Sequence, residues 1–197
     1  MLARIADFRV LIVPGLNDSG PGHWQSRWQE FYPAFERVEQ RNWDVPDLES
    51  WSEQIGHALR RSARPAVIIA HSFGCLATVH RSLAHAPNLY GALLVAPADP
   101  VKLGVNEASL QGRLRFPSAL VASEDDPWMR MERAAFWGDQ WGSDFINAGA
   151  LGHINAESGL DEWLFGLAQL QRLVQRIPGR RSCQCGGLAH DAPSASA

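Results

Sequence analysis

Residues 66–74 read AVIIAHSFG, a stretch in which an apolar, β-branched run ends at a serine that is followed two positions later by a glycine. The run Val67–Ala70 is apolar at both alternating sets of positions, which predicts a strand over Ala66–His71 that is covered on both faces, as in a parallel sheet. After Ser72, apolar residues recur at helical spacing and predict a helix over Phe73–Ala86. A buried strand that leads directly into a helix is the repeating unit of α/β folds.

Five further apolar runs occur at intervals that are too long for a β-sandwich and are suited to strands separated by helices. They are Arg9–Val13, Phe35–Gln40, Gly91–Val95, Ala119–Ala122 and Asp144–Asn147. Between the runs, apolar residues three or four positions apart predict helices. One helix begins near Trp24, and a second follows an N-cap at Asp47. Two more are predicted over Met129–Trp141 and Glu157–Ile177. We therefore expect an α/β fold with about six mainly parallel strands and helices on both faces.

The 197 residues are enough for one compact domain. We expect this domain to span residues 1–178, because Pro178 and the glycine after it end the last apolar stripe. Residues 179–197 are rich in Gly, Ala and Ser and are expected to form a flexible C-terminal tail. The span Asp99–Arg115 has no clear period, so a long surface loop or a short helical flap is expected there.

Charge and composition argue against several kinds of partner. The chain has 18 Lys and Arg against 21 Asp and Glu, a net charge of -3 that does not favour binding to nucleic acid or to anionic membranes. Its first apolar stretch, Val10–Val13, is too short for a membrane span or a signal peptide, so a cytoplasmic location is expected. Three cysteines cannot all pair, and Cys183 and Cys185 lack the spacing of a metal site, so we expect no metal.

The segment Ala70–Gly74 has the pattern small residue, any residue, Ser, any residue, Gly, which is typical of a nucleophile elbow. Such a turn lifts the Ser72 hydroxyl above the sheet. It also places the N–H of Phe73 at a helix N-terminus, where that group can stabilise an oxyanion. The alternative interpretation is a turn in which Ser72 only caps the following helix.

A serine hydroxyl is a poor nucleophile unless a base accepts its proton, so the elbow interpretation requires a histidine. Among the seven histidines, His153 lies in a Gly-rich loop after the last strand, at the sheet edge where ligand-facing residues are expected. His71 is adjacent to the serine and is expected to face away from it, and His23 lies in the first loop. The alternative for His153 is a polar loop residue near a helix start.

Three consecutive acids, Glu124, Asp125 and Asp126, follow the fifth predicted strand. A carboxylate can fix the tautomer of the histidine and stabilise its imidazolium. Asp126 followed by Pro127 also has the form of an N-cap with Pro at the first helical position, and spacing alone does not rank the three acids. The order serine, acid, histidine, each after a different strand, is that of the α/β-hydrolases.

The loop after the first strand supplies a further candidate group. Leu16 follows Pro14-Gly15 directly, and its N–H is the candidate for a second oxyanion donor beside that of Phe73. A phosphate-binding loop is the competing interpretation, but the loop has no Gly-x-Gly-x-x-Gly and no Gly-Lys-Ser/Thr ending. Trp128, beside the acids, is expected to wall a substrate pocket. Five other tryptophans, at positions 24, 28, 51, 137 and 163, are expected in the core.

Four segments together resemble the small serine-hydrolase family that includes retinoblastoma-binding protein 9 and the bacterial YdeN-like proteins. They are Val-Pro-Gly-Leu-Asn after the first strand, Ala-His-Ser-Phe-Gly, Ser-Glu-Asp-Asp-Pro-Trp and Gly-His-Ile-Asn. The resemblance runs from about Arg9 to Ile177 and implies a compact α/β-hydrolase without a large cap domain. The family nucleophile and base match Ser72 and His153, and the family acid, directly before the proline, matches Asp126. Ala70 departs from the family pattern, which usually has Gly there.

The resemblance implies a serine hydrolase, an enzyme of the carboxylesterase type, that acts on small carboxylic ester or related acyl substrates through a Ser-His-Asp catalytic triad and an acyl-enzyme. This chemistry requires no cofactor. The expected partner is therefore a small-molecule ester or acyl substrate. One alternative is an α/β-hydrolase scaffold that binds a protein partner with little or no turnover. A flavodoxin-like cofactor protein is a further alternative, and the missing phosphate loop argues against it.

Overall fold

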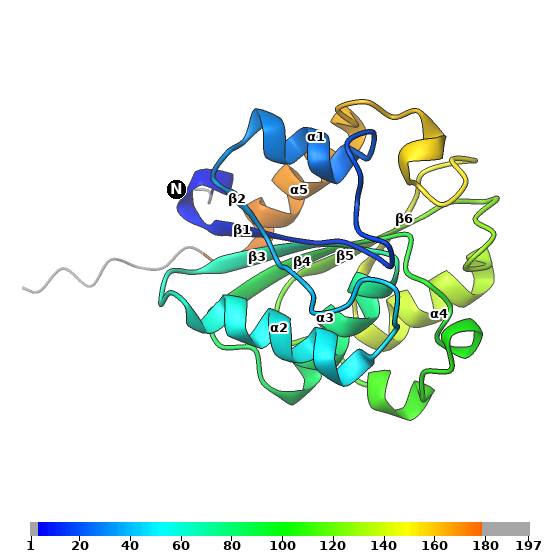
Figure 1. Ribbon diagram of the computed structural model, residues 1–197, viewed down its shortest axis with the longest axis horizontal. Coiled ribbons are helices and arrows are strands. Elements are labelled where there is room, and N and C mark those ends of the chain that lie inside the picture. The colour runs from blue at the N-terminus through cyan, green and yellow to red at the C-terminus, as the bar shows by residue number, and fades with distance from the viewer. Residues whose placement is uncertain (1–3, 179–197) are drawn as a thin grey trace, which may run out of the picture.

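The computed structural model describes residues 4–178, so the tail expected at 179–197 and Cys183 and Cys185 lie outside the described residues. Its centre is a six-stranded parallel sheet with the order β2-β1-β3-β4-β5-β6 (Figure 1). The strands are β1 (Arg9–Val13), β2 (Phe35–Arg37), β3 (Ala66–His71), β4 (Leu89–Val95), β5 (Ser118–Ala122) and β6 (Asp144–Asn147). This sheet confirms the α/β fold that the apolar runs predict.

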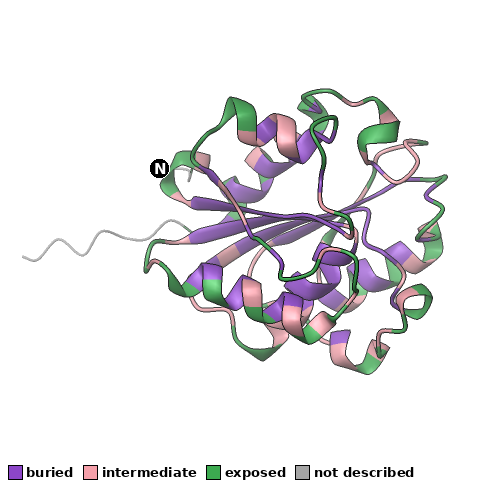
Figure 2. Ribbon diagram, viewed as in Figure 1, coloured by how far each residue is buried: buried purple, intermediate pink, exposed green. Residues whose placement is uncertain are grey.

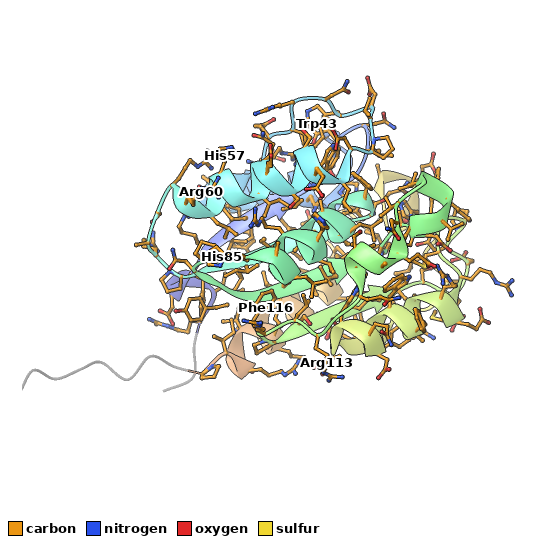
Figure 3. The ribbon with its side chains drawn as sticks, turned by 90° about the horizontal axis from the view of Figure 1, so that it is seen from below. Trp43, His57, Arg60, His85, Arg113 and Phe116 are labelled. Atoms are coloured by element: carbon orange, nitrogen blue, oxygen red, sulfur yellow. The ribbon has the colours of Figure 1, made fainter. Side chains whose placement is uncertain are left out.

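Helices cover both faces of the sheet (Figures 1 and 3). One face is covered by α1 (Trp24–Phe31) and α5 (Leu164–Arg176). The other is covered by α2 (Leu48–Arg60), α3 (Phe73–Ala84) and α4 (Met131–Trp141), and Figure 3 looks onto this face, with His57 and Arg60 labelled on α2. Within residues 4–178, no helix is long and apolar enough to cross a membrane.

The core forms two apolar layers, one on each face of the sheet, and the buried strands between them stand out in Figure 2. Val10 and Ile12 of β1 pack in the layer of α1 and α5, whereas Leu11 and Val13 pack in the layer of α2 and α3. Because both faces are covered, every residue of β1 and β3 is buried, which explains why both sequences are apolar except at Arg9 and His71. The five tryptophans expected in the core are all buried, at positions 24, 28, 51, 137 and 163.

The last helix begins at Leu164, and the prediction that it begins at Glu157 is wrong. A short 3-10 segment, η4 (Ala156–Ser158), and a turn precede this helix. Just before the helix begins, the backbone is left-handed at Asp161 and Trp163, with φ of 47° and 40°. The Trp163 ring folds back over the helix so closely that a Cβ at Gly166 would lie 2.0 Å from it. Burial of this ring between α1 and α5 therefore decides where the helix starts, although the apolar spacing continues upstream.

Among the other element ends, some agree with the prediction and some differ from it. The N-cap at Asp47 is confirmed, because its side chain accepts a hydrogen bond of 3.1 Å from Ser50 N–H. Helix α4 begins at Met131 instead of Met129, so Asp126 is not the N-cap of that helix. The span Asp99–Arg115 contains two short 3-10 segments, η2 (Pro100–Leu103) and η3 (Glu107–Leu110), which fits the helical flap better than a plain loop.

Candidate active site

Ser72 occupies a strained turn between β3 and α3. Its φ of 52° and ψ of -121° lie outside the regions that residues with a Cβ ordinarily adopt, a condition that is common at functional sites. Gly74 is required two positions later, because a Cβ there would lie 2.3 Å from the carbonyl oxygen of Pro14. The Ser72 side chain makes no capping hydrogen bond to α3, so the interpretation of Ser72 as a helix cap is wrong.

The Ser72 hydroxyl instead donates to His153, 2.8 Å from Nε2. The Nδ1–H of His153 then donates to the Asp126 carboxylate, at 2.9 Å and 3.0 Å from its two oxygens. These bonds require one tautomer of the imidazole, with the proton on Nδ1 and a free electron pair on Nε2. The side chains of Asp126 and His153 are 2% and 10% exposed, so the hydrogen bond between them is shielded from bulk water.

The three consecutive acids make different contacts. Asp126 accepts from His153 and also from the Trp128 backbone N–H, at 2.8 Å. Asp125 accepts from the backbone N–H of Gly152 at 2.7 Å, and this bond lowers the pKa of its carboxyl. Glu124 accepts from the Asn147 side chain at the end of β6. Asp125 and Glu124 thus attach the loop after β5 to the loop that carries His153, and only Asp126 contacts the imidazole.

His71 is expected to face away from Ser72, and its ring is directed at the loop that carries His153. Its ring lies 4.9 Å from that of His153, between centroids, and it lines the same cavity as Ser72. Its Nε2–H donates to the backbone oxygen of His153 at 2.9 Å. Burial, together with the charges of His23 and His153, lowers the pKa of His71 well below its ordinary value. It is therefore neutral and is not bonded to Ser72.

His23 joins this group from the first loop. Its ring packs edge-on against His71 at 4.7 Å, and its Nδ1 accepts from Gln25 N–H and so caps α1. Burial and the charges of Arg37 and His153 lower the pKa of His23 to about 3. Sequence reasoning missed the contributions of His23 and His71. The only signal was their position at the carboxyl edge of the sheet, His71 as the last residue of β3 and His23 in the first loop.

The first loop approaches Ser72 closely, as the candidate oxyanion groups require. A Cβ at Gly15 would lie 2.7 Å from the Ser72 Cβ and 3.3 Å from its hydroxyl oxygen, so only glycine allows this approach. Leu16, the next residue, lines the cavity beside Ser72. Phe73 is the first residue of α3, and its ring is buried against Trp51. The backbone of the two candidate donors thus flanks the serine.

A cavity of about 350 Å³ opens above Ser72 and His153. Its apolar wall includes Leu16, Leu103 and Trp128. Trp128 is 45% exposed, its ring lies 6.1 Å from that of His153, and it lines the cavity, on the wall where the sequence suggests it. Within residues 4–178, no group of three or more His, Cys, Asp or Glu side chains could hold a metal ion.

The model of the serine hydrolase family matches residues 10–172, most of the chain and all three residues of the hydrogen-bonded series. The chain belongs to the serine hydrolase family. A comparison with curated proteins finds no match to this serine hydrolase.

Solved structures agree with this family. A YdeN-like hydrolase from Pectobacterium atrosepticum is 36% identical, with 88% of this chain and 94% of that chain covered and a TM-score of 0.84. The ydeN gene product of B. subtilis is 20% identical over 84% of this chain and 98% of that chain, with a TM-score of 0.70. The thioesterase RedJ of Streptomyces coelicolor, at 16% identity, 84% and 85% coverage and a TM-score of 0.61, shares the fold. This serine hydrolase is a YdeN-like member of the α/β-hydrolase superfamily.

Proposed function

We propose that this serine hydrolase cleaves small carboxylic esters or related acyl compounds through a covalent acyl-enzyme on Ser72. The observation that carries the proposal is the unbroken series of hydrogen bonds from the Ser72 hydroxyl through His153 to Asp126. Each member of the series is held at the carboxyl edge of the sheet by a different strand–loop unit. Such a series is the arrangement by which a weakly acidic hydroxyl becomes a nucleophile at neutral pH.

In the first step, the Ser72 oxygen attacks the acyl carbon while its proton passes to Nε2 of His153. The carbonyl electron pair moves onto oxygen, and the Asp126 carboxylate stabilises the imidazolium. Collapse of the tetrahedral species expels the alcohol, which takes the proton from His153. Water then attacks the acyl-serine with His153 again as the base, which releases the carboxylic acid and regenerates Ser72.

The backbone N–H groups of Leu16 and Phe73 are the proposed oxyanion donors. Phe73 is the first residue of α3, so its N–H carries the partial positive charge of a helix N-terminus. Leu16 belongs to the loop that Gly15 brings against the Ser72 side chain. Removal of one such donor typically lowers kcat by about 10²–10³-fold in other hydrolases.

The cavity supports a small substrate. Its volume of about 350 Å³ is at the low end for ligand pockets, which span roughly 300–1,000 Å³. Leu16, Leu103 and Trp128 supply apolar surface for an acyl chain, and Asp18 and Glu157 line the same cavity and bear acidic groups. Because these acidic groups repel negative charge, we infer a short or medium acyl group that is not anionic.

The direct test is covalent labelling of the purified protein with a fluorophosphonate probe, combined with hydrolysis of p-nitrophenyl esters of increasing chain length. Wild-type protein should be labelled and should prefer short chains, and Ser72→Ala should lose both labelling and turnover. Ser82→Ala, on the same helix α3 but bonded only to Thr78 O, is the matched control and should behave as wild type. A folded wild-type protein that is neither labelled nor active would favour a binding scaffold instead.

A further inference from the structure

The loop that carries His153 has an unusual backbone immediately after the histidine. Ile154 adopts a left-handed conformation with φ of 47°, which is rare for any residue with a Cβ and rarer for a β-branched one. Its side chain is fully buried in the layer between α1, α5 and the sheet. Such a conformation persists only where the surrounding structure enforces it, and it is most frequent at functional sites.

Two side chains from distant parts of the chain hold this backbone. The Nε2–H of His71, at the end of β3, donates to the carbonyl oxygen of His153 at 2.9 Å. The Nε1–H of Trp24, at the start of α1, donates to the next carbonyl oxygen, that of Ile154, at 2.8 Å. Both donor residues are buried, with His71 5% and Trp24 1% exposed, so water does not compete for either bond.

The bond from His71 has one polarity. A carbonyl oxygen only accepts, so Nε2 of His71 carries a proton. Burial lowers the pKa of this ring well below its ordinary value, so Nδ1 is unprotonated and the ring is neutral. A neutral ring adds no charge beside His153 when that residue accepts the proton of Ser72. His23, packed edge-on against His71, supports the ring from the side of the first loop.

We propose that His71 and Trp24 are positioning residues, which hold the two consecutive carbonyl groups of His153 and Ile154 and so keep the strained turn that directs the imidazole at Ser72. The proposal rests on the function proposed above. It differs from a general role in folding, because loss of either N–H should misdirect the base without weakening substrate binding. A displacement of about 1 Å in a catalytic group can lower the rate of chemistry by about 10²-fold.

The test uses pairs of variants that differ in the N–H group. In His71→Gln the amide nitrogen is as many bonds from Cβ as Nε2 of histidine, so the donor is retained, whereas His71→Met has similar length and no donor. We expect kcat for a p-nitrophenyl ester to fall by about 10²-fold in His71→Met and by less than about fivefold in His71→Gln, with KM within about threefold of wild type in both. Trp24→Phe, which keeps an aromatic ring, should lower kcat by about tenfold.

Three controls separate positioning from folding and from the proposed function. The melting temperature and the fraction of sites labelled at completion by a fluorophosphonate should stay near wild type, while the labelling rate falls with kcat. Equal kcat values for the Gln and Met variants would overturn the proposal, and so would a change confined to KM. If His71→Met does not fold, a wild-type kcat in Trp24→Phe would still refute the role of the second bond. Absence of labelling in wild type would refute the proposed function itself.

Discussion

His23 should make the protein less stable as the pH falls from 7 to 5. The residue is 4% exposed, and burial together with the charges of Arg37 and His153 lowers the pKa of its imidazole from 6.5 to about 3. Below pH 6.5 the unfolded imidazole therefore binds a proton that the folded one does not. The contribution of His23 to the free energy of unfolding is fully present above pH 6.5. It is lost as the pH falls towards about 3, because proton binding then favours the unfolded state.

The size of the effect at pH 5 depends mainly on the ordinary pKa of the histidine. Each pH unit inside the window changes the free energy of unfolding by about 1.4 kcal/mol, so the roughly 1.5 units between 6.5 and 5 amount to about 2 kcal/mol. A domain with a stability of about 5–15 kcal/mol would show this loss clearly. His71, whose pKa is lowered chiefly by burial, acts in the same direction.

The decisive variant is His23→Asn. Its amide oxygen lies where Nδ1 accepts from the Gln25 N–H, so the cap of α1 is kept while the titrating group is removed. Urea unfolding at pH 7 and pH 5 should show that wild type loses about 2 kcal/mol more than His23→Asn. His85→Asn, at an exposed position, controls for the loss of an imidazole as such. Equal losses in wild type and His23→Asn would refute the reasoning.

Three more outcomes are expected. Asp126→Asn should lower kcat by about 10³–10⁴-fold, because an amide cannot hold the imidazole tautomer. Asp125→Asn should lower kcat by less than about tenfold, because its amide oxygen can still accept the backbone N–H of Gly152. Steady-state kinetics with p-nitrophenyl acetate ranks the two, and the reverse ranking would assign the acid to Asp125. Gly74→Ala should destabilise the fold by more than about 3 kcal/mol, because its Cβ would lie 2.3 Å from Pro14 O; an unchanged melting temperature would contradict that contact. Trp128→Ala should raise KM by about tenfold for longer esters and leave acetate unaffected, and equal effects on all chain lengths would exclude Trp128 from the acyl wall.

Much of the fold could be predicted because a parallel sheet covered on both faces leaves a plain signal. The strands over Arg9–Val13, Ala66–His71 and Asp144–Asn147 have the predicted bounds, and the first two are apolar except at Arg9 and His71, as expected for strands buried on both faces. The start of the last helix could not be predicted, because apolar spacing continues upstream of Leu164. Whether those residues are helical depends on where the Trp163 ring is buried, which is a contact between distant segments.

In the candidate site, too, some residues could be predicted from the sequence and others could not. Ser72 and His153 could be selected from the sequence, since an elbow pattern and a Gly-rich loop each follow a strand, and parallel strands end at one edge of the sheet. The acids could not be ranked by spacing, because adjacent residues differ only in the direction that a turn gives them. The structure directs Asp126 at the imidazole and Asp125 at the backbone N–H of Gly152.

The sequence by itself therefore determined the α/β class, the order of serine, acid and histidine along the chain, and the small residues of the elbow pattern around Ser72. These are local properties, because they depend on the period of apolar residues and on the space that a Cβ requires. Only the tertiary structure decided which carboxylate reaches His153, and that His71 and Trp24 hold the turn at Ile154. Those contacts join residues far apart in the chain, and their geometry exists only once the core is packed.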